Sequence, residues 1–382
     1  MSPFLLIKYK KCGYMKKIIS TLVLISIVIS SLLCLASCDD FFKLGGNNND
    51  GENDSDITYK KLVSYAHFHT VSNIYAYGDI SEDEFEEYVK LADETLSYYH
   101  KLFDIYYQYA GVSNIKNINN KAGKEAVKVD KELIDFLLYC KELYAYTNGK
   151  TNIMLGSVLK IWHDLREDAE GDFGYLDPAR LPTAEALSAA AEHTSIDSLV
   201  IDEENSTVYI SDPKASIDVG AIGKGYAVEK LAKVLEDAGA DSLVLNIGGN
   251  LRFIGEKSDG EGWLTGIKNP DKDAENSIKC KVEVSDTSLV TSGDYERYFI
   301  AGDKKYHHII DPVTLVPADY FASVSIITED SGLADALSTA LFCMSYEDGL
   351  ALVTEIGNID VIWIYKDGSV KYTDGLTITD LK

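Results

Sequence analysis

The order of its secondary-structure signals constrains the fold of this 382-residue chain more than any other feature. Helical periodicity dominates residues 81–193, whereas short strand-like segments dominate the chain from residue 198 onward. The strand segments are joined by tight turns such as Ala301-Gly-Asp-Lys304, and they do not alternate regularly with helices. Regular alternation would instead predict a doubly wound parallel sheet. We therefore predict an α+β fold with mixed, largely antiparallel sheets and flanking helices.

Several helices begin or end at recognisable signals. Ser81-Glu-Asp-Glu84 is a capping box, Pro182-Thr-Ala-Glu185 opens a later helix, and Asn148-Gly149 ends another. The expected helices cover residues 82–108, 129–146, 153–165, 182–193, 226–238, 332–344 and 346–356. The expected strands cover residues 59–77 (two strands or a hairpin), 198–202, 207–211, 215–219, 242–247, 251–255, 263–268, 279–284, 295–300, 305–310, 323–328, 360–365 and 370–373.

The amino-terminal segment is typical of a secretory signal. Lysines precede an apolar run from Ile18 to Leu35, and Leu35-Ala-Ser-Cys38 follows it. This ending is similar to a bacterial lipobox, so we expect residues 1–37 to be removed and Cys38 to carry lipid. The alternative is a membrane-spanning helix, because the run is close to the shortest that crosses a bilayer. Five Ser or Thr residues interrupt the run, which favours the lipoprotein.

The net charge of the chain and the composition after Cys38 limit the kinds of molecule that the protein can bind. Residues 39–56 are rich in Asn, Gly and Asp, which predicts a flexible tether over residues 38–56 and a folded domain over residues 57–382. The net charge of −25 would repel nucleic acid and anionic lipid, so we expect no nucleic-acid partner. Contact with the bilayer would come from acylated Cys38, which predicts an extracytoplasmic, membrane-anchored protein. The remaining cysteines lack metal-site spacing and suit buried apolar positions: Cys140, Cys280 and Cys343.

The segment Asp218-Val-Gly-Ala-Ile-Gly-Lys-Gly225 has the pattern of an anion-binding loop. A strand-like segment leads into glycines and then into a helix, which directs backbone N–H groups at a ligand. Lys224 adds a mobile positive charge suited to phosphate. The spacing matches neither the dinucleotide fingerprint nor the Walker A loop. A tight turn that serves only backbone geometry is the alternative.

Asp335 and Thr339 are four residues apart in a predicted helix and therefore share one face. A carboxylate, a hydroxyl and a carbonyl from elsewhere make the oxygen ligand set that Mg²⁺ prefers. The alternative is that Asp335 only favours the helix dipole and Thr339 only packs.

His308 is a candidate general base, because an unperturbed histidine titrates near neutral pH. A packed, hydrogen-bonding histidine is the alternative. Since neighbours on a strand face opposite sides, one of His307 and His308 should point outward.

Five segments, taken together and in this order, resemble the ApbE family of FAD:protein FMN transferases. The family carries an Asp-hydrophobic-Gly-x-x-x-Lys-Gly-Tyr-Ala loop, an Asn-x-Gly-Gly turn, a Thr-Ser-Gly-Asp-Tyr segment, a His-x-Ile-Asp-Pro strand end and an Ala-Asp-Ala-x-Ser-Thr-Ala helix. The matching segments here are Asp218–Ala227, Asn246–Gly249, Thr291–Tyr295, His308–Pro312 and Ala334–Ala340. The resemblance implies an ApbE-like fold.

The resemblance also implies a reaction and a set of site residues. FMN would pass from FAD to a Thr (or Ser) hydroxyl of a target protein through a phosphoester bond, releasing AMP, with Mg²⁺ as cofactor. The metal would be held by the Ala221 carbonyl, Asp335 and Thr339. His308 would act as base or orient the hydroxyl, and Lys224 would offset the charge of the pyrophosphate. The residues expected to contact FAD are Asp218, Lys224, Ile309, Lys150, Thr151 and Asn152.

Two departures from the family pattern stand near this site. Asn152 occupies a position where the family usually has Asp, and Leu315 follows Thr314 where the family usually has Gly. A leucine does not easily adopt a positive φ, which predicts a reshaped loop. Two other functions remain open: an FAD pyrophosphatase that gives FMN and AMP, and a non-catalytic flavin-binding lipoprotein. The expected acceptor is a membrane or surface flavoprotein.

Overall fold

The computed structural model describes residues 57–64, 67–171, 173–257 and 260–379. The predicted signal segment of residues 1–37, Cys38 and the rest of the predicted tether lie outside these residues. Among the helices in the described part of the chain, none is long and apolar enough to cross a membrane.

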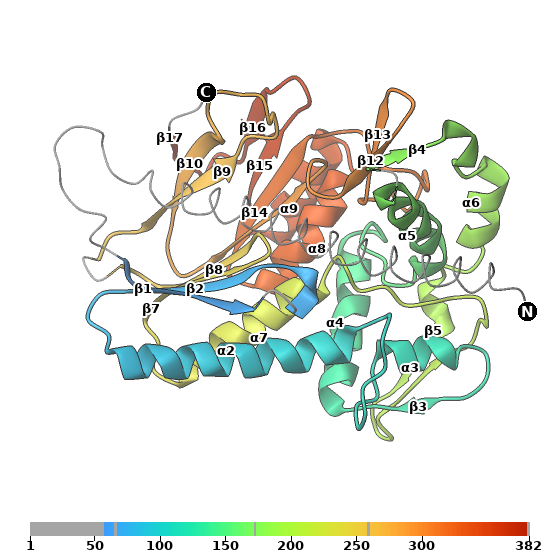
Figure 1. The fold of residues 1–382 in the computed structure, drawn as a ribbon, viewed down its shortest axis with the longest axis horizontal. Helices are drawn as coiled ribbons and strands as arrows, with labels where there is room; N and C mark the ends of the chain where they lie inside the picture. The colour runs from blue at the N-terminus through green and yellow to red at the C-terminus, as the bar shows by residue number, and fades with distance from the viewer. Residues whose placement is uncertain (1–56, 65–66, 172, 258–259, 380–382) are drawn as a thin grey trace, which may run out of the picture.

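An eight-stranded sheet forms the centre of the molecule (Figure 1). Every neighbouring pair in it is antiparallel. In spatial order the strands are β1 (Ile57–Ser64), β2 (Ser72–Tyr77), β7 (Ser242–Ile247), β8 (Asn250–Gly255), β11 (Ser288–Gly293), β14 (Ser323–Thr328), β15 (Asp360–Ile364) and β16 (Val370–Tyr372).

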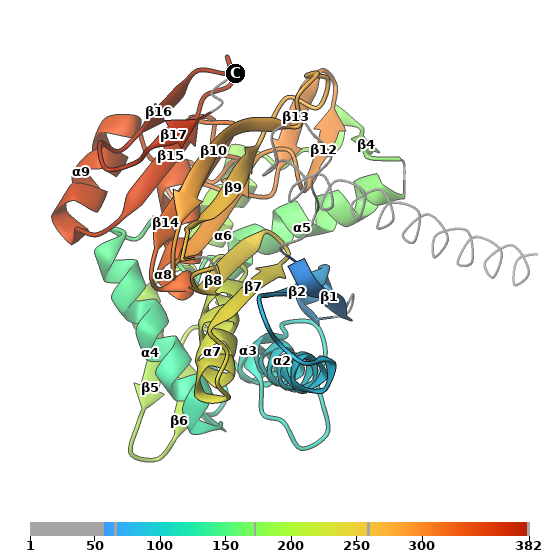
Figure 2. The same ribbon diagram turned by 90° about the vertical axis from the view of Figure 1, so that its left-hand side faces the viewer.

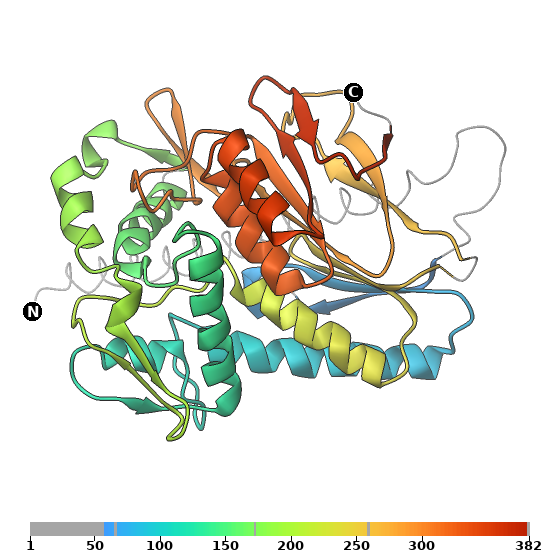
Figure 3. The same cartoon turned by 180° about the vertical axis from the view of Figure 1, so that it is seen from behind.

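The two faces of this sheet have different coverings, and alternate residues of one strand separate them. Ile74 and Ala76 of β2 pack with helices α2 and α7, whereas Tyr75 and Tyr77 pack with Trp263 on the opposite face. Figures 2 and 3 show the helices on one side and the strands β9 and β10 on the other. The helical layer contains α2 (Glu82–Phe103), α7 (Gly223–Asp237), α8 (Ser331–Phe342) and α9 (Tyr346–Ile356); the opposite layer contains β9 (Trp263–Lys268), β10 (Ile278–Val284) and β17 (Ile378–Thr379).

Two smaller groups of elements flank the helical layer. One packs around Leu133, Phe136 and Ile217, and the other around Trp162 and Phe299. The first contains α3 (Ile115–Asn120), α4 (Lys131–Tyr146), β3 (Val127–Lys128), β5 (Leu199–Asp202), β6 (Thr207–Ile210) and the 3₁₀ turn Ile196–Ser198. The second contains α5 (Gly156–Glu170), α6 (Ala184–Ala191), β4 (Tyr175–Leu176), β12 (Tyr298–Ala301), β13 (Lys304–His307) and the 3₁₀ turn Pro178–Arg180.

The predicted α+β class and most predicted elements are confirmed, with three corrections. Residues 215–219 are not a strand: Ile217 exchanges backbone hydrogen bonds with the Asn119 side chain instead of with a neighbouring strand. Helix α2 ends at Phe103 and not near residue 108, because the Asp104 carboxylate accepts from the N–H groups of the next turn. The prediction also missed helix α3 and the strands β3, β4, β11 and β17, of which β11 is central to the main sheet.

Candidate active site

The amino-terminal ends of α7 and α8 approach each other very closely. A Cβ built on Gly225 would lie 2.2 Å from the Ser331 carbonyl oxygen and 2.5 Å from the Asp335 Cβ. A side chain at residue 225 would therefore separate the two helices. Gly225 is thus required by helix packing, and as a consequence Asp335 lies against the first turn of α7.

Asp335 and Lys224 meet at this crossing. Asp335 Oδ2 accepts a hydrogen bond of 2.9 Å from the Gly225 N–H, and Oδ1 lies 3.5 Å from Lys224 Nζ. Lys224 Nζ also donates to Asn250 Oδ1 at 3.2 Å. Asn250 begins β8, directly after the turn at Gly248 and Gly249, where both glycines have positive φ. The glycine loop before α7, the Asp335 motif of α8 and the end of the Asn-x-Gly-Gly turn therefore meet at this crossing.

One of the groups expected to bind Mg²⁺, the Asp335 carboxylate, lies at this crossing. Gly225 lies in the first turn of α7, where an N–H group has no intrahelical acceptor, and Asp335 supplies one. Ala221 lies two residues before α7, in the loop that leads into the helix, and no hydrogen bond to its carbonyl is found among the described residues. Thr339 lies one turn beyond Asp335 on α8. In the described part of the chain there is no cluster of three or more His, Cys, Asp or Glu side chains that suits a metal, so a cation here would use mixed oxygen ligands.

The Asp218 carboxylate lies near His163, in the middle of α5. Its Oδ1 accepts from the Gly220 N–H at 2.9 Å, and its Oδ2 lies 3.9 Å from His163 Nδ1. The Tyr106 hydroxyl is 3.4 Å from the same nitrogen. Burial lowers the pKa of His163, so the ring is neutral at neutral pH. Neither His163 nor Tyr106 was expected from the sequence.

His308 and His307 have different environments. His307 is buried, and both its ring nitrogens are bonded: Nε2 donates to the Ala318 carbonyl at 2.8 Å and Nδ1 accepts from the Ile309 N–H at 3.3 Å. His308 is half-buried, and its Nδ1 donates to the Arg297 carbonyl at 3.2 Å. In this tautomer Nε2 of His308 is the unprotonated nitrogen.

The surroundings of His308 disfavour its charged form. Burial, followed by the positive charge of Arg297, lowers the pKa of His308 to about 3. Arg166 of α5 acts in the same direction. The ring is therefore neutral and able to accept a proton, and an anion bound beside it would raise its pKa. Sequence reasoning did not identify the role of either arginine.

The segment Lys150-Thr151-Asn152 connects the His308 strand end to α8. Lys150 Nζ lies 2.9 Å from the buried Asp311 carboxylate, which is three residues after His308. The buried Thr151 hydroxyl donates to the Ala336 carbonyl at 2.8 Å, one residue after Asp335. These contacts hold the two motifs in a fixed relation.

The side chains of Asn152 and Ile309, which were expected to contact FAD, make contacts with other parts of the protein. The Asn152 amide Nδ2 donates to the Thr194 carbonyl at 3.0 Å, and its Oδ1 accepts from the Met154 N–H at 2.9 Å. An Asp at this position could make only the second bond. The Ile309 side chain is buried and packs with Phe321 and other core residues beside α8.

The loop at Leu315 differs from the prediction. We expected leucine to avoid a positive φ, but Leu315 has a φ of 64°. Two hydrogen bonds hold it: the Leu315 N–H donates to the Asp311 carbonyl at 2.8 Å, and the Leu315 carbonyl accepts from Trp162 Nε1 at 2.9 Å. The loop therefore keeps the turn that glycine would form.

Comparisons with known proteins agree with this architecture. The model of the ApbE family matches residues 67–363. A FAD:protein FMN transferase of Klebsiella pneumoniae is 30% identical over 259 residues, covering 68% of this chain and 77% of that protein. The FAD:protein FMN transferase of Haemophilus influenzae is 25% identical over 358 residues, covering 92% of this chain and 94% of that protein.

Solved structures give the same result. The ApbE protein of Thermotoga maritima has a TM-score of 0.71 and 26% identity, covering 83% of this chain and 97% of that one. The flavin transferase ApbE from Vibrio cholerae has a TM-score of 0.67 and 26% identity, covering 82% of this chain and 96% of that one. The predicted ApbE-like fold is thus confirmed, and this chain belongs to the ApbE family.

Proposed function

We propose that this chain is an Mg²⁺-dependent enzyme that transfers FMN from FAD to a threonine or serine hydroxyl of another protein, releasing AMP. Membership of a family whose curated relatives are FAD:protein FMN transferases supports flavin transfer as the activity. The single observation that carries the finer proposal is the meeting of Lys224 and Asp335 at the α7–α8 crossing, directly after the loop that contains Ala221.

The Ala221 carbonyl, Asp335 and the Thr339 hydroxyl would hold the cation. When bound, Mg²⁺ would offset the negative charge of the pyrophosphate and act as a Lewis acid toward it. Lys224 would offset part of the same negative charge on the pyrophosphate, because its ammonium group is already held beside Asp335 and Asn250. Asp218 remains a candidate contact for the nucleotide.

His308 is the candidate proton acceptor. The acceptor hydroxyl oxygen attacks the FMN-side phosphorus, the bond between that phosphorus and the bridging oxygen breaks, and AMP leaves with the electron pair. The hydroxyl proton passes to Nε2 of His308, which is unprotonated because Nδ1 donates to Arg297. The pKa of about 3 makes the ring a weak base. The anionic substrate would raise that pKa, so the base would strengthen when FAD is bound.

The amino-terminal sequence supports a proposal for where in the cell the enzyme acts. We propose that Cys38 carries lipid on the outer side of the membrane and that residues 38–56 tether the domain to it. A flexible coil of this length reaches roughly 20–25 Å, which suits an acceptor in the membrane or at the cell surface.

One incubation tests the proposed reaction. The full chain is mixed with FAD, Mg²⁺ and a threonine-bearing acceptor protein, and both AMP and acceptor-bound flavin fluorescence are measured. Covalent fluorescence on the acceptor together with AMP is the expected result. AMP and FMN without labelled acceptor would identify a pyrophosphatase, and bound but unchanged FAD would identify a flavin-binding protein; either result would overturn the proposal.

A further inference from the structure

Helices α7 and α8 exchange hydrogen bonds twice, at positions one helical turn apart. The Gly225 N–H of α7 donates to Asp335 of α8, and the Ser331 N–H of α8 donates to Glu229 Oε2 of α7 at 2.9 Å. Glu229 is four residues after Gly225, and Ser331 is four residues before Asp335. Each helix thus places a carboxylate on a first-turn N–H group of the other.

The Ser331 N–H needs this partner. Asp330, the residue before α8, caps the next two N–H groups, those of Gly332 and Leu333, at 2.7 and 3.0 Å. Ser331 itself is fully buried, so water does not replace a missing acceptor for its N–H group. Glu229 therefore fixes the first residue of α8, and Asp335 follows one turn later.

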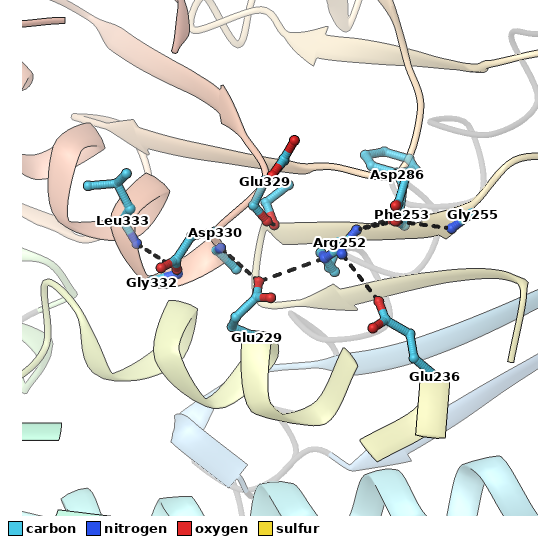
Figure 4. A network of polar contacts seen from close by, with 12 residues as sticks. Glu229, Glu236, Arg252, Phe253, Gly255, Asp286, Glu329, Asp330, Gly332 and Leu333 are labelled. Atoms are coloured by element: carbon cyan, nitrogen blue, oxygen red, sulfur yellow. Dashed lines mark hydrogen bonds and ion pairs between the residues drawn. The ribbon is translucent and has the colours of Figure 1, made fainter. Parts of the chain in front are cut away.

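Glu229 is itself held in place by Arg252 (Figure 4). Arg252 comes from β8 and is almost completely buried among three carboxylates. Its Nε lies 3.7 Å from Glu229 Oε2, and its two terminal nitrogens lie 3.3 Å from Glu236 and 3.1 Å from Asp286. Burial raises the pKa of Glu229, and the Arg252 charge and the Ser331 N–H oppose that shift. Arg252 therefore favours the ionised form of Glu229, in which both carboxylate oxygens can accept hydrogen bonds.

We propose that Glu229 is a positioning residue for the divalent-cation site. It clamps the first residue of α8 to α7, with Arg252 as its counter-charge, and so sets the position of Asp335 relative to the first turn of α7. This inference rests on the proposed function, because that function requires a cation at Asp335. Mg²⁺ demands nearly ideal ligand geometry, whereas Ca²⁺ tolerates longer and more variable distances. Loosening the clamp should therefore weaken Mg²⁺ binding more than Ca²⁺ binding.

Two conservative variants separate the clamp from its charge. Glu229→Gln keeps the length that reaches the Ser331 N–H but loses the charge, whereas Glu229→Asp keeps the charge but is one methylene short. Glu236→Gln is the matched control, because Glu236 pairs with the same Arg252 and no contact of its side chain with α8 is found in the described residues. Cation binding to the full chain is measured by calorimetry with Mg²⁺ alone and with Ca²⁺ alone, and folding is checked by thermal unfolding.

We expect Glu229→Asp to raise the dissociation constant for Mg²⁺ by roughly 10-fold or more and to lower the preference for Mg²⁺ over Ca²⁺. Glu229→Gln should bind Mg²⁺ more tightly than Glu229→Asp, and Glu236→Gln should resemble the wild type. Wild-type binding by a folded Glu229→Asp protein, or equal weakening by Glu236→Gln, would overturn the clamp. A wild-type chain that binds no Mg²⁺ would overturn the cation site and the clamp together. A chain that binds Mg²⁺ but transfers no flavin would refute only the reaction, and the Asp–Gln comparison would still decide the clamp.

Discussion

The substitution Gly225→Ala gives the most direct test of the α7–α8 crossing. The added Cβ would lie 2.2 Å from the Ser331 carbonyl oxygen, a contact that real Cβ atoms essentially never show. The two helices must therefore part by roughly 1 Å at this point, and overpacking of this kind costs about 1–3 kcal/mol of folding free energy. Because Asp335 moves with α8, we also expect roughly 10²-fold slower flavin transfer, the effect of a 1 Å misplacement of a catalytic group.

Gly349→Ala in α9 is the matched control. The Cβ built there lies 3.4 Å from Leu341 Cγ and 3.7 Å from the Trp363 ring, which are ordinary van der Waals contacts. This variant should be as stable as the wild type or up to about 1 kcal/mol more stable, since alanine favours a helix over glycine. Its activity should be unchanged.

The assay for both variants combines urea unfolding with AMP release and acceptor labelling over a series of Mg²⁺ concentrations. We expect lower stability and slower transfer in Gly225→Ala but not in Gly349→Ala. A Gly225→Ala protein with wild-type stability and wild-type Mg²⁺ dependence would show that the two helices are not held at this distance. Equal losses in both variants would point to a general sensitivity of the helical layer.

Further predictions concern single groups. Asp335→Asn keeps the size of the side chain but replaces the carboxylate, so Mg²⁺-dependent AMP release should be lost; an unchanged rate with the same Mg²⁺ dependence would refute the metal assignment. His308→Asn should slow transfer by roughly 10²-fold or more, whereas His307→Asn should mainly lower stability; equal small losses in both would make His308 structural. Burial lowers the pKa of His307 from 6.5 to about 4, so the unfolded chain takes up its proton first on acidification. Stability measured by urea unfolding should therefore fall between pH 6.5 and 4, by at most about 3 kcal/mol from this group; the fall should shrink in His307→Asn. Cys38→Ser should release the protein from membranes on fractionation with its turnover intact, and a variant that still sediments with its signal uncleaved would indicate a transmembrane helix.

The sequence was informative wherever one segment contains its own signal. Ser81 was predicted to cap α2, and its hydroxyl accepts from the Glu84 N–H. Strand β11 carries no such signal, because Thr291 and Ser292 interrupt the apolar pattern in the centre of the sheet. Their hydroxyls pair with Ser325 at 2.7 Å and Ser338 at 2.8 Å, residues more than thirty positions away. Such a polar central strand is stable only once its partners are in place, so local alternation did not identify it.

The same limit applies to the candidate site. Lys224 and Asp335 belong to motifs with glycines or small residues, which mark a close approach in the sequence itself. Glu229 and Arg252 are single charged residues on a helix and a strand, where a charge usually indicates only a solvent-exposed face. Their importance follows from burial and from partners on other elements, and neither property is visible in a single sequence.

The charges around the α7–α8 crossing give a reason for the proposed cation. Asp335 contributes a negative charge at this crossing, and Lys224 contributes one positive charge at 3.5 Å from it. Asp218, five residues before α7, adds a second negative charge beside His163. The positive ends of two helix dipoles compensate the carboxylates only in part. Without a cation this region would therefore repel the anionic pyrophosphate, in a chain whose net charge is already −25. A divalent cation on Asp335 reverses the local sign, and it would also leave Lys224 free to turn from Asp335 toward the phosphate. Substrate affinity should accordingly depend on Mg²⁺ before any chemistry occurs. Equilibrium binding of FAD to the His308→Asn variant, measured with and without Mg²⁺, tests this, and Mg²⁺-independent affinity would contradict it.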